Sequence, residues 1–298
     1  MEDFYLILFC ISMGYLVQKL DILPKDLAMN LNQFAIYILL PAMVLLQVPK
    51  LSFSTEFITP IVVAWVVMGS TAGLTLYLSR WFGFSKEVTG ALLLVTILGN
   101  SSFMGIPLVK AYYGEEALPF VLIYDQLGTF IAFSLYGTFI AAYYSAKSEI
   151  SVGMLVRKIF SFPPFLALLV SLTLMGVEFD KNVTYVLSSL ANCIIPVALI
   201  AVGLQLQLRL EREEMAPFAL SLGIKLVLAP LIAFAVCSLF GWNDLSATVA
   251  IMEAGMASMI TAGAIASVAG LAPKLSTSIV GYSILLSFVS TNILYALL

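Results

Sequence analysis

Long runs of apolar residues alternate with short clusters of charged residues from one end of the chain to the other. A helix needs about 20 mostly apolar residues to cross the hydrocarbon core of a bilayer, and most of the runs approach that length. With the charged clusters taken as boundaries, the pattern predicts an all-α membrane protein with ten spans. Spans 1 to 10 are expected at residues 4–20, 29–48, 57–79, 88–109, 118–145, 159–177, 183–208, 215–240, 245–270 and 275–297.

The composition agrees with this pattern and excludes several classes of protein. Hydrophobic residues make up 61% of the chain and charged residues 10%, whereas soluble domains average about 45–50% and 25%. The net charge is −3 and the lysines and arginines are dispersed, so we expect no basic face that could bind nucleic acid. The chain has no histidine and its 3 cysteines lie far apart, so we expect neither a metal site nor a cofactor.

The lysines and arginines predict how the spans are oriented, because cytoplasmic loops carry an excess of these residues. The bias predicts that both termini lie outside a plasma or bacterial inner membrane. The acidic start of the chain is unlike a cleavable signal peptide, so we expect span 1 to be retained. The larger, predicted cytoplasmic set is Lys19, Lys25, Arg80, Lys86, Lys147, Arg157, Lys158, Arg209, Arg212 and Lys274, and the smaller set is Lys50, Lys110 and Lys181.

Matching residues recur at a nearly constant offset and predict an internal repeat. A first repeat would cover residues 1–150 with spans 1 to 5, and a second would cover residues 151–298 with spans 6 to 10. Because each half has an odd number of spans, the halves would cross the membrane in opposite directions, as in the inverted repeats of many secondary transporters. The pairs are Pro41 and Pro196, 155 residues apart, Gly83 and Gly241, 158 apart, and Gly114 and Gly270, 156 apart.

Span 4 is interrupted at its centre by polar and helix-breaking residues. No charged residue lies between Val88 and Val109, yet residues 99–107 read Gly-Asn-Ser-Ser-Phe-Met-Gly-Ile-Pro. Irregular backbone at membrane depth persists only where protein shields it or where it lines a polar cavity. The repeat places the equivalent part of span 9 at 255–263, which is again rich in small and polar residues. Paired interruptions of this kind indicate the binding site of a transporter.

Two broken helices that cross at mid-membrane would offer half-helix ends to a ligand. The N-terminal ends suit an anion, and freed carbonyl groups suit a cation. Small residues also line ordinary helix contacts in membranes, and span 9, which has no proline at its interruption, is open to that interpretation. The candidate substrate-binding residues are Gly99, Asn100, Ser101, Met256, Ala257 and Ser258, and the candidate helix breaks are Gly105, Pro107, Gly255, Pro41 and Pro196.

Three ionisable residues lie inside the predicted spans, namely Asp125 in span 5, Lys225 in span 8 and Glu253 in span 9. Charges inside a membrane are costly and mark functional sites. Lys225 is expected to pair with Asp125 or Glu253, which would leave one acid for a coupling proton or for a sodium ion near Glu253. A purely structural ion pair is the alternative.

One stretch carries a family resemblance. Residues 100–108 read Asn-Ser-Ser-Phe-Met-Gly-Ile-Pro-Leu and resemble the Asn-Thr-x-x-Met-Gly-Ile-Pro-Leu signature of the auxin efflux carrier family, whose plant members are the PIN proteins. The resemblance runs the full length of the chain. Residues 40–42, 125–129 and 253–256 also look like the bacterial branch of that family.

The resemblance implies a ten-helix elevator-type transporter related to the bile-acid symporter and sodium/proton antiporter fold. Spans 1, 2, 6 and 7 would form a scaffold domain that dimerises, and spans 3–5 and 8–10 a mobile transport domain. In the PIN branch the asparagine that matches Asn100 contacts the substrate carboxylate. The sequence departs from that branch at Gly99 and Ala257, where PIN proteins have prolines, although glycine is permissive enough for a break in span 4.

We therefore expect a secondary transporter of a small organic anion, such as malate, malonate or an auxin-like acid. It would work as a homodimer in lipid, with H⁺ or Na⁺ as candidate coupling ions. A cation/proton antiporter that uses Asp125, Glu253 and Lys225 is the alternative. A membrane-embedded enzyme fits poorly, because the chain lacks histidine, a Gly-x-Ser-x-Gly elbow and a phosphate loop, and a passive channel is a distant alternative.

Overall fold

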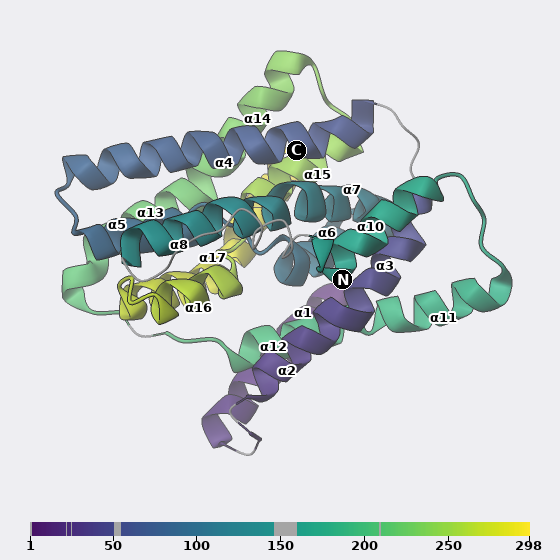
Figure 1. The fold of residues 1–298 in the computed structure, drawn as a ribbon, viewed down its shortest axis with the longest axis horizontal. Helices are drawn as coiled ribbons and strands as arrows, with labels where there is room; N and C mark the ends of the chain where they lie inside the picture. Colours follow the sequence, from purple (N-terminus) through teal and green to yellow (C-terminus); the bar gives the residue numbers. More distant parts are fainter. Residues whose placement is uncertain (1, 22, 25, 51–54, 146–159, 209) are drawn as a thin grey trace.

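The computed structural model describes residues 2–21, 23–24, 26–50, 55–145, 160–208 and 210–298, and these residues are almost entirely helical (Figure 1). The described residues form no β-strand, and β-type pairing among them is limited to an isolated antiparallel bridge between Gly99 and Ser258. The predicted start of span 6 at residue 159 lies outside the described residues. So do the predicted cytoplasmic bases Lys25, Lys147, Arg157, Lys158 and Arg209.

The helices follow one another closely along the chain. In the first half they are α1 (Glu2–Leu20), α2 (Leu27–Phe34), α3 (Leu40–Gln47), α4 (Thr55–Trp81), α5 (Lys86–Val95), α6 (Ile106–Tyr113), α7 (Leu118–Ile123) and α8 (Thr138–Ser145). In the second half they are α10 (Pro163–Thr173), α11 (Lys181–Asn192), α12 (Ile194–Leu204), α13 (Met215–Gly223), α14 (Ala229–Phe240), α15 (Leu245–Ala254), α16 (Ile260–Val268) and α17 (Pro273–Leu297).

Short segments of other helix types join several of these α-helices. The π-helical segments are η1 (Ala35–Leu39), η3 (Ser101–Gly105), η5 (Tyr124–Phe130), η6 (Phe133–Gly137) and η8 (Ile224–Leu228). The 3₁₀ segments are η2 (Val48–Lys50), η4 (Glu115–Ala117) and η7 (Arg212–Glu214). Because these segments run directly into their neighbours, several of the long helical stretches are continuous from end to end.

Within the described ranges, 6 helical stretches are long and apolar enough to cross a membrane. They correspond to predicted spans 2, 3, 5, 7, 8 and 10. Spans 1 and 6 correspond to the shorter apolar helices Tyr5–Leu20 and Pro163–Thr173, and spans 4 and 9 are each divided into two helices. The all-helical membrane fold is as expected, while the ten-span inverted repeat stays a prediction. The 6 stretches are Leu27–Lys50, Glu56–Trp81, Glu115–Ser145, Lys181–Leu204, Arg212–Phe240 and Pro273–Leu297.

Three prolines widen the helix that they interrupt instead of ending it. Pro41, Pro107 and Pro230 each stand two residues after a π-helical segment, η1, η3 and η8 respectively. A proline has no N–H to donate, and its ring collides with the carbonyl group one turn earlier, so a helix that continues through it takes a wider turn. The structure therefore corrects the prediction that helices break at Pro41 and Pro107. Pro196 does not end a helix either, but it lies inside the regular α-helix α12.

The helices form two groups, which Figure 1 shows side by side. In one group α1 and α2 pack against α12, and α3 packs against α10 and α11. In the other, α4 packs against α14 and α15, while α5 packs against α8, α16 and α17. The two groups contact each other where η3 packs against α12, α6 against α1 and α7 against α3. The interruption in span 4 thus lies at the boundary between the groups.

Two glycines let α1 and α12 approach each other closely. A Cβ atom built on Gly203 would overlap the carbonyl oxygen of Ile11, and one built on Gly14 would overlap the carbonyl oxygen of Ile200. Without a hydrophobic driving force between helices in lipid, such close backbone contact is a main source of packing energy. The α1–α12 pair is therefore a tightly packed part of its group.

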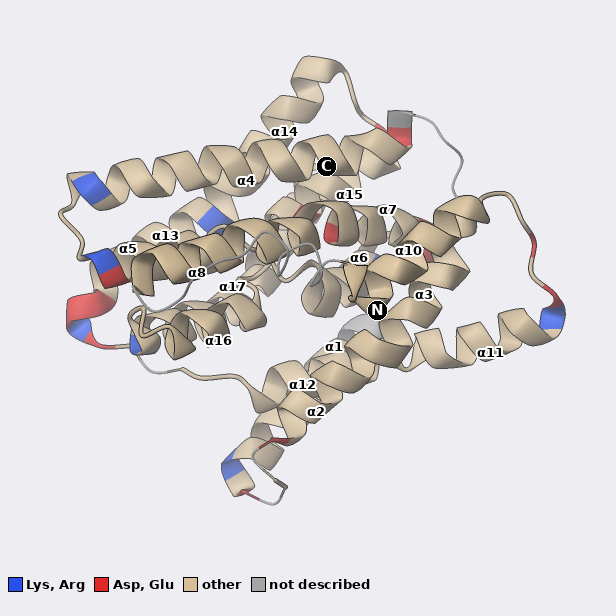
Figure 2. Ribbon diagram, viewed as in Figure 1, with Lys and Arg blue, Asp and Glu red and all other residues tan. Residues whose placement is uncertain are grey.

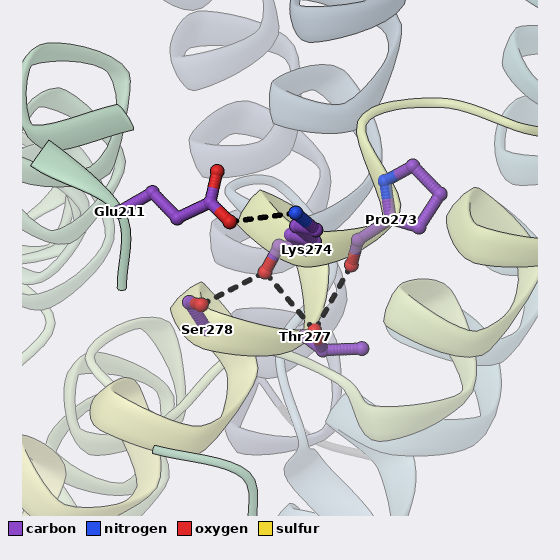
Figure 3. Close-up of polar contacts among 5 residues, drawn as sticks. All are labelled: Glu211, Pro273, Lys274, Thr277 and Ser278. Atoms are coloured by element: carbon purple, nitrogen blue, oxygen red, sulfur yellow. Dashed lines mark hydrogen bonds and ion pairs between the residues drawn. The ribbon is translucent and has the colours of Figure 1, made fainter. Parts of the chain in front are cut away.

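Charged residues lie mainly at helix ends, as Figure 2 shows, and the helix bodies are largely uncharged. At the start of α17, for example, Lys274 Nζ lies 2.6 Å from Glu211 Oε1, an exposed ion pair (Figure 3). The first turn of that helix is reinforced because Thr277 Oγ1 donates to the carbonyl oxygen of Pro273 at 2.9 Å and Ser278 Oγ donates to that of Lys274 at 2.8 Å. The ion pair ties the segment before η7 to α17.

Candidate functional site

The interruption of span 4 lies at residues 96–100. Helix α5 ends at Val95 and the helix resumes with η3 at Ser101, which continues directly into α6. Gly105 and Pro107, predicted as the breaking residues, therefore lie in the resumed helix and not at the break. The earlier position follows from the backbone of Asn100, which has φ −88° and ψ 60° and is not helical.

The interruption of span 9 lies at residues 255–259, between the end of α15 at Ala254 and the start of α16 at Ile260. Gly255 directly follows the end of α15. The two interruptions pair with each other as short antiparallel strands, because Asn100 N donates to the carbonyl oxygen of Ala257 at 2.8 Å and Met259 N donates to that of Leu98 at 2.9 Å. Backbone groups freed from helix thus satisfy one another, as burial requires.

Asn100, in the interruption of span 4, has a side chain that could bind a ligand. The residue is 4% exposed, and its Oδ1 accepts a hydrogen bond from Phe103 N at 3.3 Å, which caps η3. Its Nδ2 atom is buried and has no hydrogen-bond partner among the described residues. A buried amide donor without a partner costs free energy, so the position favours a bound acceptor.

A central cavity of about 50 Å³ lies beside Asn100, between the two groups of helices. Two helix starts line it, one through Ser101 and Ser102 and the other through Ile260 and Thr261. The first N–H groups of a helix lack acceptors within the helix, and the helix dipole makes this end partly positive. Donors from three sources therefore surround one small volume, with apolar walls from Ile36, Leu40, Phe103, Phe130 and Phe162.

Asp125, which also lines the central cavity, is held by three donors. Its Oδ1 accepts from Ser101 Oγ at 2.5 Å and from Ser102 Oγ at 2.6 Å, and its Oδ2 accepts from Gln126 Nε2 at 2.5 Å. These three hydrogen bonds offset part of the cost of burying the carboxyl group. Ser102 and Gln126 were not among the site residues predicted from the sequence. The signal for both was their position next to residues that were predicted.

Lys225 and Glu253 occupy the space left by the two glycines of span 4. The Nζ atom of Lys225 would lie 2.9 Å from a Cβ atom built on Gly99, and a Cβ atom on Gly105 would overlap both carboxylate oxygens of Glu253. Neither glycine could therefore be replaced by a larger residue without moving a buried charged side chain. Both side chains are buried, at 3% and 1% exposed.

The predicted pairing of Lys225 with an acid is not a direct contact. In the part of the chain that the structure describes, the ion pairs within 4.0 Å are Lys110–Glu115 and Lys274–Glu211. The three buried ionisable residues instead converge on one segment, since Asp125 binds its serines and the other two residues lie against Gly99 and Gly105. No group of three or more His, Cys, Asp or Glu side chains that could hold a metal ion occurs among the described residues.

Larger cavities lie near opposite ends of α12. One, of about 480 Å³, is lined by Gln18, Gln205 and Thr277, and it shares Ile260 with the central cavity. The other, of about 200 Å³, is lined by Gln47, Asn192 and the ion-paired Lys110 and Glu115. The larger of these two cavities therefore adjoins the central cavity, and the smaller lies toward the other end of α12.

Ser258 and Met256 differ in what they offer to a ligand. Ser258 N donates to Ser283 Oγ at 3.0 Å, while Ser258 Oγ is buried with no partner in the described structure. Met256 is fully buried in the apolar core and is not among the residues that line the central cavity. Of the six candidate substrate-binding residues, Gly99, Asn100 and Ser101 line that cavity. Ala257 and Ser258 pair with Asn100 and Gly99 through the backbone and are not among the lining residues.

Comparison with known proteins gives the family of the chain. A family model described as membrane transport protein matches residues 1–295. A protein of Methanothermobacter thermautotrophicus, named as an uncharacterized transporter, is 27% identical over 291 residues, which cover 95% of this chain and 93% of the relative. A second uncharacterized transporter, from Methanocaldococcus jannaschii, is 26% identical over 278 residues, which cover 87% of this chain and 85% of the relative. The chain is thus an integral membrane protein and a member of the membrane transport protein family, the family of the auxin efflux carriers.

Proposed function

We propose that this protein is a secondary transporter that binds the carboxylate of a small organic anion at Asn100. The single observation that carries this proposal is the buried, unpartnered Nδ2 of Asn100 at a cavity lined by two helix starts. Each of these groups donates hydrogen bonds or carries partial positive charge, so together they suit an anion. Asp125 also lines this cavity, but its carboxylate already accepts three hydrogen bonds, and a cation there would gain nothing from Asn100 Nδ2.

The size of the central cavity limits what it can hold in this conformation. A volume of about 50 Å³ accommodates a carboxylate group or a few water molecules. The rest of a dicarboxylate or of an aromatic acid would have to extend into one of the neighbouring cavities, of about 480 and 200 Å³. Malate, malonate and auxin-like acids all satisfy this requirement, since each has a carboxylate on a small body.

The movement that we propose is an elevator-type displacement of one group of helices past the other. Spans 1, 2, 6 and 7 would form the scaffold domain, through which two copies dimerise, and spans 3–5 and 8–10 the transport domain. The location of the cavity supports this mechanism, because its walls come from both groups, with Ile36, Leu40 and Phe162 on one side and the two interruptions on the other. A sliding movement would open the same donors first to one end of α12 and then to the other.

The proposed site is tested by replacing Asn100 with Ala. A hydrogen bond to a charged ligand is worth about 1.5–3 kcal/mol, so the variant should bind a carboxylate about 10- to 100-fold more weakly. A panel of malate, malonate and indole-3-acetate is screened by thermal shift, and uptake of the best ligand is then measured in proteoliposomes. Asn243→Ala, at an exposed position after α14, is the matched control and should behave as the wild type. If no carboxylate stabilises the wild type, or if Asn100→Ala responds as strongly, the anion site is wrong.

A cation/proton antiporter is the second candidate, and the convergence of Asp125, Lys225 and Glu253 on residues 99–105 favours it over a passive channel or an enzyme. In an antiporter these side chains would carry the transported ions, so Asn100→Ala would leave ion exchange intact. A passive channel would give linear, non-saturating flux in the same proteoliposomes, and an enzyme would give a chemical product. Saturable, counterflow-competent anion uptake distinguishes the transporter from all three.

A further inference from the structure

Glu253 combines deep burial with a lack of hydrogen-bond donors. The residue is 1% exposed, and neither of its carboxylate oxygens has a hydrogen-bond partner in the described part of the chain. Its carboxylate instead lies on the backbone of Gly105, at the end of the same five-residue segment, η3, that Asn100 caps. An ionised carboxylate without donors in a buried position is much less stable than one in water, because burying an unpaired charge is costly. The neutral carboxylic acid is therefore the form that this environment accommodates.

On the basis of the proposed anion site, we infer that Glu253 carries one proton that is bound and transported together with the carboxylate, which makes the protein an anion–proton symporter. Water at one membrane face supplies the proton, which forms an O–H bond with the Glu253 carboxylate. That bond breaks at the other face, where the proton returns to water as the anion leaves. No other reactant is needed.

The charged groups around Glu253 determine the sign of this coupling. Its carboxylate interacts electrostatically with Asp125 and Lys225, and also with the hydroxyl of Tyr124. Lys225 is the positive group among these partners, so when both acids are ionised its charge can offset only one of them. Charged residues on the other elements packed against α15 lie at exposed helix ends, and they are Glu56, Arg80, Glu115, Glu116 and Lys274.

A carboxylate bound at Asn100 would add a negative charge to this surrounding. With Glu253 ionised, two uncompensated negative charges would stand at the two ends of η3, and their repulsion would oppose binding. With Glu253 protonated, the bound anion is the remaining net charge. Protonation of Glu253 and anion binding therefore favour each other. By thermodynamic linkage, the proton raises the affinity for the anion by the same factor by which the anion raises the affinity for the proton.

The size of the coupling follows from the length of η3. Its five residues place the two charges about 8 Å apart at about 1.5 Å rise per residue. At an effective dielectric constant of about 20, this separation corresponds to roughly a thirtyfold change in affinity. The wild-type protein should thus bind its carboxylate about thirtyfold more tightly with Glu253 protonated than with Glu253 ionised.

A proton fits this position better than a sodium ion. Sodium would need several oxygen ligands around Glu253, and the ammonium group of Lys225, which interacts electrostatically with this carboxylate, would repel a second cation. A proton needs only the carboxylate itself. We therefore expect carboxylate binding to depend on pH and not on whether the salt is sodium or choline chloride.

The test compares the wild type with Glu253→Gln, which keeps the size of the side chain and resembles its protonated form. Dissociation constants for the best carboxylate of the malate, malonate and indole-3-acetate panel are measured from pH 5 to pH 8 in sodium and in choline salts. The wild type should lose up to about thirtyfold in affinity as pH rises, whereas Glu253→Gln should keep the tighter value throughout. The matched control Glu116→Gln, at an exposed position in η4, should retain the wild-type pH dependence.

A second measurement uses the wild type alone and does not depend on how well a variant folds. In weakly buffered solution, adding the carboxylate at a pH midway between the ionisation midpoints of Glu253 in the free and in the bound protein should cause uptake of about 0.7 proton per protein, the maximum for a thirtyfold coupling, read with a pH-sensitive dye. Carboxylate binding that depends on Asn100 but shows no pH dependence and no proton uptake would overturn the symport inference and leave the proposed anion site intact. The symport inference would also be overturned if the carboxylate affinity of Glu253→Gln varied with pH as in the wild type. It would likewise be overturned if the affinity depended on sodium and not on pH. Absence of any carboxylate binding would instead reject both.

Discussion

Gly105→Ala is the most direct test of the packing that places Glu253 at the proposed transport site. The new Cβ atom would overlap both carboxylate oxygens of Glu253, so this buried side chain or the η3 backbone has to move. Overpacking of a well-packed interior costs about 1–3 kcal/mol. We expect a fall of several degrees in the unfolding temperature of the detergent-solubilised protein, followed by tryptophan fluorescence.

Two further variants separate a specific clash from general damage. Gly73→Ala lies in α4 where a Cβ atom would meet no other atom within 4 Å, so it should be neutral or stabilising by up to about 1 kcal/mol. In a Glu253→Ala background the added methyl group of Gly105→Ala has space, and its cost should fall below about 0.5 kcal/mol. The double-mutant cycle should thus report a coupling of about 1–3 kcal/mol between positions 105 and 253.

Either of two results would refute the contact between Glu253 and Gly105. If Gly105→Ala were as stable as Gly73→Ala, the Glu253 carboxylate would not lie on Gly105. If Gly105→Ala were equally destabilising with and without the Glu253 side chain, the cost would come from the η3 backbone alone.

Two other substitutions address the remaining contacts. Asp125→Asn keeps the shape of the side chain but replaces the carboxyl group that accepts hydrogen bonds from Ser101 and Ser102. The protein should lose about 1.5–3 kcal/mol of stability, seen as a lower unfolding temperature. An unchanged unfolding temperature would argue against this network. Gly203→Val should separate α1 from α12, because its Cβ atom would overlap the Ile11 carbonyl oxygen. We expect it to lower the unfolding temperature more than Gly73→Ala does. Equal unfolding temperatures for the two variants would argue against the close approach of α1 and α12.

The breaks in the two helices were partly predictable from the sequence. A run of apolar residues with an amide, hydroxyls and glycines at its centre cannot remain a simple lipid-facing helix, and this is a local property of the run. The position of the break within span 4 was not predictable in the same way. Pro107 looked like the breaking residue, but a helix can continue through a proline by widening to a π-helical turn, so the interruption lies at residues 96–100 instead.

The sequence by itself determined the number of long apolar runs, the membrane class of the protein, its family and the choice of Asn100 as the candidate ligand contact, because each of these depends on residues close together in the chain. The tertiary structure decided which distant residues meet. Asp125, Lys225 and Glu253 come from three different helices, and they converge on the segment between Gly99 and Gly105 because of how those helices pack and rotate against each other. Apolar run length does not encode that rotation, so the sequence left Asp125 and Glu253 as alternative acids for a coupling ion. Only the assembled helices showed that Asp125 is held by two serines, whereas the Glu253 carboxylate has no hydrogen-bond partner among the described residues.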